Sequence, residues 1–128
     1  MIAIKEIAVK KSSIDGLGIF AKKNFRKDEL VIRWSSHREL SKDEIGKLSK
    51  KDQEHVSFIN GKYILVPPNG RVNHSCDPNV RLNNFCYFAK QDIQADEEIT
   101  ADYREESEKG FAMKCNCKSK NCTGYISV

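Results

Sequence analysis

The C-terminal segment KCNCKSKNCTGYISV constrains the fold of this chain more than any other stretch, because it is too rich in cysteine, lysine and asparagine to form core. Something other than apolar burial must hold it in place. Three of its residues, Cys115, Cys117 and Cys122, follow the spacing Cys-x-Cys-x4-Cys. Tetrahedral zinc binds four thiolate or imidazole groups, and short spacings let one loop wrap the ion. The segment therefore predicts a zinc site that still lacks one ligand.

The missing ligand has three candidates upstream. Cys76 lies in a polar loop close to Pro78, and His74 precedes it by two positions. Cys86 lies in the apolar stretch NFCYFA, where a cysteine is usually a small buried hydrophobe. Cys76 is therefore the better candidate. Three unrelated reduced thiols, or a disulfide with spare cysteines, are the alternatives. An odd total of 5 cysteines without a secretory signal argues against a secreted disulfide framework.

The chain has 128 residues, enough for one domain but too few for two ordinary ones. With 39% hydrophobic and 31% charged residues, its composition is that of a soluble globular protein. Apolar runs are only strand-sized, so no membrane span is expected. The N-terminus lacks the pattern of a secretory signal. We expect a cytoplasmic protein, or a nuclear or host-targeted one if it comes from a eukaryote or acts as an effector.

The net charge of +4 indicates a mild preference for acidic partners. A dense lysine and arginine stripe is missing, and so is an RRM-like aromatic signature. Direct nucleic-acid binding is therefore not expected.

Local patterns predict a mainly β domain with one or two short helices. The sequence Ser41-Lys-Asp-Glu44 is a capping box, so a short helix should begin there. Asn83 and Asn84 tolerate the positive φ of a tight hairpin turn. Alternation or β-forming residues predict strands in IAIKEIAVK (Ile2 to Val9), IDGLGIFAKK, DELVIRW, KYILVPP, EEITADY and, as a hairpin, RLNNFCYFAKQDI.

The segment NHSCDPN at residues 73–79 admits three interpretations from its residue types alone. His74 and Cys76 could form a nucleophilic pair, but they lie only two positions apart and no third group is evident to orient them. A zinc ligand at Cys76 would exclude that role. The third interpretation is a polar turn, because Asn, Ser and Asp bond to nearby backbone and Pro78 fixes the bend.

Four segments in order resemble the SET-domain protein lysine methyltransferases. They are IDGLGIFAKKNFRKDELVI, GRVNHSCDPNV, EEITADY and the post-SET tail CNCKSKNCTGYI. The resemblance implies a SET domain over residues 1–110, a variable insert at Ser35–Val66 and a post-SET zinc-binding tail over 111–128. It also implies several small curved, β-clip-like sheets, in which the NHSC and ADY segments pass each other as a pseudoknot.

The resemblance further implies transfer of methyl groups from S-adenosylmethionine to a protein lysine, with Tyr103 as the catalytic residue. It implies a Zn²⁺ ion held by Cys76, Cys115, Cys117 and Cys122. The donor would contact Asp15, Gly16, Leu17, Gly18, Trp34, Asn73, His74 and Tyr103, with Asn73 and His74 acting largely through their backbone and the glycines letting the backbone approach.

One departure from the family affects the product. The family commonly has Phe or Tyr two positions before the catalytic tyrosine, whereas this chain has Ala101. Either the channel is then wider, or another aromatic residue such as Phe85, Tyr87 or Phe111 fills it, and the number of methyl groups added stays open. A histone or another basic protein is a candidate substrate, and the sequence leaves the oligomeric state open. Alternative functions are a SET-like module that binds peptide or donor without catalysis, and a small zinc-binding interaction domain.

Overall fold

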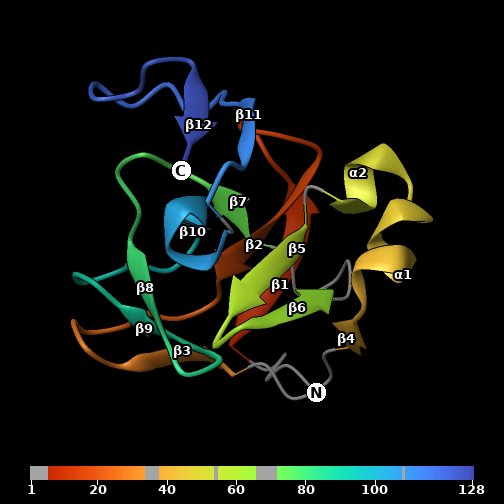
Figure 1. The fold of residues 1–128 in the computed structure, drawn as a ribbon. Coiled ribbons are helices and arrows are strands. Elements are labelled where there is room, and N and C mark those ends of the chain that lie inside the picture. The colour runs from red at the N-terminus through yellow and green to blue at the C-terminus, as the bar shows by residue number, and fades with distance from the viewer. Residues whose placement is uncertain (1–5, 34–37, 54, 66–71, 108) are drawn as a thin grey trace.

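In the part of the chain that the structure describes, short strands form four small sheets (Figure 1). The structure is a computed structural model and describes residues 6–33, 38–53, 55–65, 72–107 and 109–128. Two short α-helices lie on one side of the sheets, and the tail (residues 111–128) lies at one end. This arrangement confirms the prediction of a mainly β fold with few helices.

The central four-stranded sheet brings together segments that are distant in sequence. Its order is β1(Ile7–Lys11), β2(Leu17–Ala21), β10(Glu98–Ala101) and β7(Asn73–His74). The first three strands are antiparallel, but β7 runs parallel to β10 and pairs Asn73 with Thr100 and His74 with Ala101. The NHSC and ADY segments therefore lie side by side, as the resemblance implied.

A three-stranded sheet contains the predicted hairpin. Its order is β3(Leu30–Arg33), β9(Cys86–Ala89) and β8(Val80–Asn83). The prediction placed Asn83 and Asn84 in the turn, which is wrong by one residue. Asn83 still pairs with Cys86, and the positive φ angles of 49° and 64° fall on Asn84 and Phe85. A two-residue hairpin loop needs positive φ at both central positions, so the ladder sets which residues adopt it.

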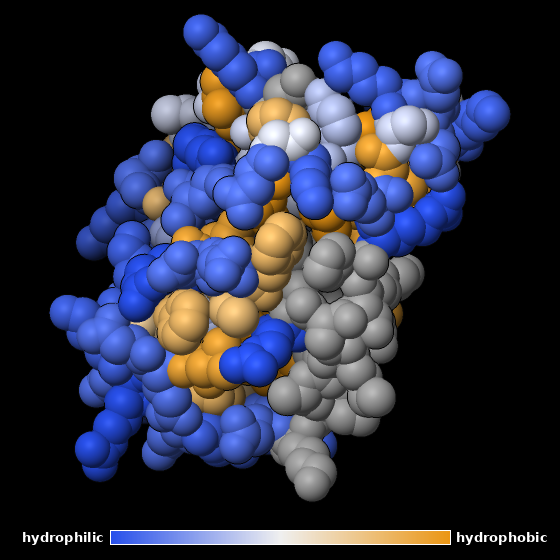
Figure 2. Space-filling view, turned by 60° about the horizontal axis from the view of Figure 1, so that its bottom comes forward, coloured by the Kyte–Doolittle hydropathy of each residue, from blue (hydrophilic) through white to orange (hydrophobic). Residues whose placement is uncertain are grey.

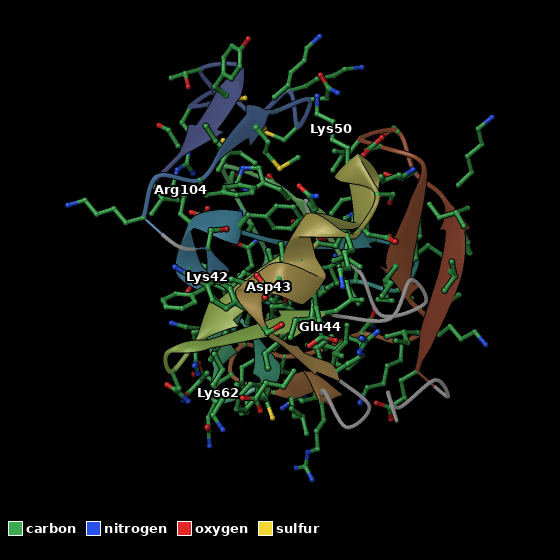
Figure 3. All side chains as sticks on the ribbon, turned by 45° about the vertical axis from the view of Figure 1, so that its right-hand side comes forward. Lys42, Asp43, Glu44, Lys50, Lys62 and Arg104 are labelled. Atoms are coloured by element: carbon green, nitrogen blue, oxygen red, sulfur yellow. The ribbon has the colours of Figure 1, made fainter. Side chains whose placement is uncertain are left out.

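The insert forms another three-stranded sheet, in the order β4(Arg38–Leu40), β6(Lys62–Leu65) and β5(Val56–Ile59). Its helices α1(Lys42–Gly46) and α2(Lys50–Gln53) lie in front of this sheet in Figure 3. The capping box is confirmed, with Ser41 and Glu44 each accepting the other's backbone N–H at 3.2 and 3.1 Å. The described residues contain two α-helices, in agreement with the one or two short helices that were predicted, and the first of them ends at Gly46.

Two hydrophobic clusters stabilise the molecule. The larger one lies between the sheets and includes Ile19, Ile32 and Ile99, each at most 1% exposed. The smaller one joins Tyr103 to Cys115 and Ile126 of the tail. The tail was predicted to stay out of the core, and this cluster corrects that view, because β11(Ala112–Lys114) and β12(Tyr125–Ser127) pair and bury Ile126 completely.

Hydrophilic side chains cover most of the face shown in Figure 2. Within the described part of the chain, no helix has the length and apolar character needed to cross a membrane.

Candidate functional site

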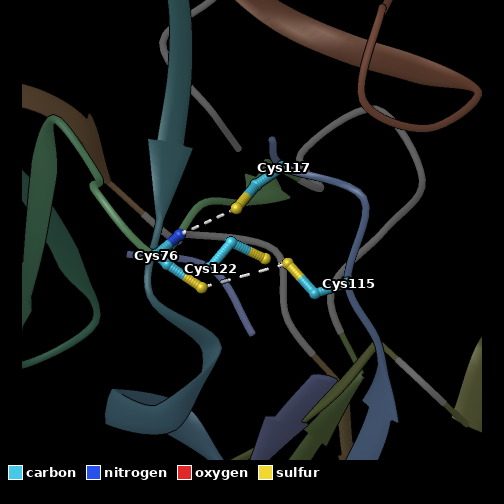
Figure 4. Close-up of side chains that lie close together, drawn as sticks. All are labelled: Cys76, Cys115, Cys117 and Cys122. Carbon is cyan, nitrogen blue, oxygen red and sulfur yellow. Dashed lines mark hydrogen bonds between the residues drawn. The ribbon is translucent and has the colours of Figure 1, made fainter. Parts of the chain in front are cut away.

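The four cysteines predicted as metal ligands lie together at the junction of the tail and the central sheet (Figure 4). The sulfur atoms of Cys76, Cys115, Cys117 and Cys122 all lie within 4.8 Å of one another, and no disulfide joins them. In a tetrahedral site with Zn–S bonds of about 2.3 Å, the sulfurs are roughly 3.8 Å apart. The separation of 4.0 Å between Cys76 and Cys115 is close to that value. The donor set therefore fits a zinc ion, and Cys86 is not part of it.

Nearby hydrogen-bond donors favour thiolates in this cluster. Burial raises the pKa of the Cys117 thiol, but the backbone N–H of Cys76 and the Ser119 hydroxyl outweigh burial and lower that pKa to about 6. Burial raises the pKa of Cys76. The Arg104 guanidinium, whose Nη2 lies 3.8 Å from Cys76 Sγ, lowers that pKa but has the smaller effect. Burial also raises the pKa of Cys115. Only a cation among the four sulfurs would make all of them thiolates at neutral pH.

The His74 side chain connects this cluster to Tyr103. His74 Nδ1 accepts the backbone N–H of Tyr103 at 3.0 Å, and Nε2 lies 3.3 Å from Cys76 Sγ. Burial lowers the pKa of His74 to about 4, although the Asp102 carboxylate acts in the opposite direction, so the ring is neutral at pH 7. Because Nδ1 accepts, the single ring proton lies on Nε2 and points at the sulfur. Both ring nitrogens of the imidazole are thus engaged within the protein.

Asn73 holds the glycine-rich turn in place. Its side-chain amide donates to the carbonyl oxygens of Asp15 at 3.0 Å and Leu17 at 3.2 Å, and to the Glu98 carboxylate at 2.9 Å. Gly16 has a φ of +44°, a backbone conformation that is strained in residues with a side chain. Gly18 is buried and was predicted to let the backbone approach a donor. In the structure its missing Cβ makes room for Glu98.

A narrow pocket gathers much of the predicted donor site. Asp15, Asn73, His74 and Tyr103 line it together, and Gly16 and Leu17 belong to the same turn as Asp15. The Tyr103 hydroxyl donates to the carbonyl oxygen of Val72 at 2.6 Å. The predicted Trp34 lies outside the described residues.

The rest of the pocket wall comes from residues that the sequence did not indicate. Open space in the pocket is about 30 Å³, little more than room for water, so a larger ligand must displace part of the wall. The ring of His55, in the predicted insert at residues 35–66, meets the ring of Tyr103 edge-on with centroids 6.3 Å apart. No local pattern could have revealed His55. The remaining lining residues are Ile14, Met113, Lys114, Cys115, Asn116 and Ile126.

A wider groove of about 490 Å³ lies between the insert and the start of the tail. Three aromatic residues line it, Phe58, Tyr63 and Phe111, together with Lys42, Ile45, Gln53, Val56, Lys109 and Gly110. Lys42 lies at the beginning of α1. In Figure 3, Lys42 and Arg104 are seen on the same side of that helix. Segments 55–58 and 110–113 contribute to both the pocket and the groove, so the two are neighbours.

Ala101 is 1% exposed in β10, and the three aromatic residues considered for the channel lie in different surroundings. Tyr87 is buried and its hydroxyl bonds to Glu106 at 2.6 Å. Phe85 packs against the large core cluster, and Phe111 against the cluster that contains Tyr103.

The fold and site define a small β-rich domain in which a cysteine-rich tail packs against Tyr103, a tyrosine that follows strand β10. Comparison with known families shows that residues 16–104 match the SET domain. This chain belongs to the SET-domain family.

Individual relatives agree with this assignment. The chain is 28% identical over 138 residues to an H3 lysine-36 specific histone-lysine N-methyltransferase of Candida glabrata, covering 94% of this chain and 19% of that protein. It is 31% identical over 148 residues to histone-lysine N-methyltransferase ATX2 of Arabidopsis thaliana, covering 96% and 13%. The chain thus spans less than a fifth of the length of these two relatives.

A solved structure confirms the fold. The methyltransferase domain of human histone-lysine N-methyltransferase SETMAR superposes with a TM-score of 0.71 at 22% identity, over 93% of this chain and 56% of that one.

Proposed function

We propose that this chain transfers methyl groups from S-adenosylmethionine to a lysine side chain of a protein. The observation that carries the proposal is the convergence of Asp15, Asn73, His74 and Tyr103 on one pocket beside an aromatic groove. Membership of the SET-domain family and relatives named histone-lysine N-methyltransferases support it. When bound, the donor would supply a methyl group on a sulfonium, so the protein has to align that group with an amine and keep water away.

Tyr103 is the proposed catalytic residue. Its hydroxyl proton is directed to the Val72 carbonyl oxygen, so the phenol oxygen is held in a fixed orientation toward the pocket that Tyr103 lines. Weak C–H···O contacts to that oxygen would orient the methyl group. The neighbouring rings of His74 and His55, with centroids 5.3 and 6.3 Å from that of Tyr103, hold the phenol in place. Asp102 is proposed to have a structural role, because its side chain accepts the backbone N–H of Arg104 at 3.0 Å and so stabilises the turn that begins at Tyr103.

For the donor we propose contacts with residues 15–18, Asn73, His74 and Tyr103, and with Trp34, which stays a prediction. Because the pocket is narrow, a bound donor would have to displace part of its wall.

The aromatic groove is the proposed seat of the substrate lysine. Phe58, Tyr63 and Phe111 would surround an aliphatic lysine chain and desolvate its amine, which lowers the lysine pKa and favours the neutral, nucleophilic form. A histone or another basic protein is the proposed substrate class. In a eukaryotic cell such a substrate would place the protein in the nucleus.

We also propose that Zn²⁺ joins the tail to the domain of residues 1–110 through Cys76, Cys115, Cys117 and Cys122. The ion would fix the tail that walls the pocket, because Cys115 contributes to both. It would take no part in the methyl transfer itself.

The test is transfer of a labelled methyl group to a mixture of basic proteins, with Tyr103→Phe as the decisive variant. We expect label on lysine, reduced about tenfold or more by the substitution, because removal of the hydroxyl loses the alignment of the methyl group. Tyr125→Phe is the matched control, since Tyr125 is 65% exposed and lies in β12. Tight donor binding without transfer to any protein would instead favour a binding module without catalysis.

A further inference from the structure

A carboxylic acid is buried behind the site and was not indicated by any motif. Glu106 is 7% exposed, and both of its oxygens are occupied. The Tyr87 hydroxyl donates to Oε2 at 2.6 Å, and the Ser57 hydroxyl donates to Oε1 at 3.1 Å. Tyr87 and Ser57 are themselves only 2% and 3% exposed. Burying a carboxyl group is costly unless its hydrogen bonds are satisfied, and a buried network with satisfied bonds makes the elements that it joins rigid.

The three residues come from three different parts of the fold. Ser57 lies in β5 of the insert sheet, Tyr87 lies in β9 of the hairpin sheet, and Glu106 is the last residue of the 3₁₀ helix η2(Tyr103–Glu106). Tyr103 is the first residue of the same helix. The Ser107 hydroxyl donates to the Tyr103 carbonyl oxygen at 2.5 Å, which closes this single turn into one unit. Fixing Glu106 therefore fixes the backbone of Tyr103.

The hydrogen bonds among Glu106, Tyr87 and Ser57 also fix the position of β5 relative to Tyr103. In a strand, alternate side chains point to opposite faces. Ser57 points to Glu106, while its neighbours Val56 and Phe58 line the aromatic groove. His55, two residues before Ser57, meets the ring of Tyr103 edge-on. The hydrogen bond between Ser57 and Glu106 thus fixes the position of the groove wall relative to the Tyr103 ring.

Glu106 is not placed to act on a substrate directly. It lines neither the narrow pocket nor the aromatic groove. The charged groups that raise its pKa, Glu105 and Asp102, are carboxylates on its own segment, and the groups from β5 and β9 are neutral hydroxyls. It therefore lacks the access that a general base needs.

We propose that Glu106, through Tyr87 and Ser57, is a positioning residue that holds Tyr103 and the insert strand β5 in register for methyl transfer. This inference rests on the proposed function for its effect on catalysis, but not for its effect on the structure around Tyr103.

The experiment compares Glu106→Ala, Glu106→Gln and Glu105→Ala in the full chain. We expect Glu106→Ala to lower kcat about 10- to 100-fold, because small misplacements of a catalytic group have effects of that size, while the Kd for the donor changes little. Glutamine can accept from Tyr87 and donate to Ser57, so Glu106→Gln should recover most of the loss. Glu105 is exposed on the same helix, and its variant should match wild type.

A second measurement does not depend on activity. Amide hydrogen exchange at Tyr103, whose N–H bonds to His74, should be faster in Glu106→Ala than in Glu105→Ala. If the wild-type protein transfers no methyl group, the proposed function fails while this measurement still decides the positioning role. If Glu106→Ala does not fold, Tyr87→Phe, which removes one bond, should show the same two effects in smaller size. Wild-type kcat together with wild-type exchange in a folded variant would overturn the inference.

Discussion

At the scale of single residues, His74 shows how one side chain serves two sites. The residue lines the proposed donor pocket, and its ring bonds on one side to the Tyr103 amide and on the other to Cys76. Groups that bond to metal-binding cysteines tune the charge and geometry of the ligand. The ring therefore links the cysteine cluster to the residue proposed to carry the chemistry.

Replacing His74 by Phe tests this link, because the ring is kept and both hydrogen bonds are lost. We expect metal affinity to fall about 10- to 100-fold, measured by competition with a chelator. We also expect the free energy of unfolding to fall by roughly 1–3 kcal/mol, since the buried N–H of Tyr103 loses its partner. Cys86→Ser is the control, because Cys86 lies outside the cluster. Equal metal affinity in His74→Phe and wild type would contradict the proposed link.

At the scale of elements, the tail depends on the cysteine cluster. Among the strands that the structure describes, β11 and β12 pair with each other alone, and the tail contacts Cys76 and the small cluster around Tyr103. Asn121 adds a hydrogen bond to the Cys76 carbonyl oxygen at 2.9 Å. A two-stranded ribbon is marginally stable alone, so the proposed metal ion would add a constraint to the packing of Ile126 in the small cluster.

Metal analysis and chelation test this dependence. We expect one zinc per chain, and after chelation we expect faster hydrogen exchange in residues 111–128 while β1, β2 and β10 stay protected. Activity should be lost at the same step, because the tail walls the pocket. Cys122→Ser should resemble the chelated protein, and Cys86→Ser should retain the metal. A folded protein that contains no metal would rule out the proposed site.

At the scale of the whole molecule, Glu106 ties the stability of the fold to pH. Burial raises its pKa from 4.5 to about 7, although the bonds from Tyr87 and Ser57 act against burial. Between these values the native state binds a proton that the unfolded state has released. Stability from this group is therefore greatest below pH 4.5 and decreases as pH rises toward 7.

Chemical unfolding of wild type and Glu106→Gln at several pH values isolates this effect, because all other titrating groups are common to both proteins. His74, which titrates in the opposite sense, is one of them. We expect wild type to lose about 3 kcal/mol relative to the variant between pH 4.5 and pH 7. Parallel stability curves for the two proteins would show that Glu106 is not the titrating group.

Local sequence patterns were reliable where a single segment decides its own structure. Ser41 and Glu44 form the predicted capping box, and the hairpin of β8 and β9 appears where it was expected. The turn was misplaced by one residue because pairing of Asn83 with Cys86 decides it. His55 and Glu106 could not be found in this way, since their roles depend on partners 48 and 49 positions away, Tyr103 and Ser57.

The sequence by itself determined the strand-rich architecture, the family and the four cysteines, because each follows from residue types at short spacing. The tertiary structure decided what those residues meet. Parallel pairing of β7 with β10 places His74 beside Tyr103. Burial of Glu106, the last residue of η2, places its carboxyl group between two sheets. These contacts join segments far apart in the chain, and their geometry exists only once the sheets have packed around a common core.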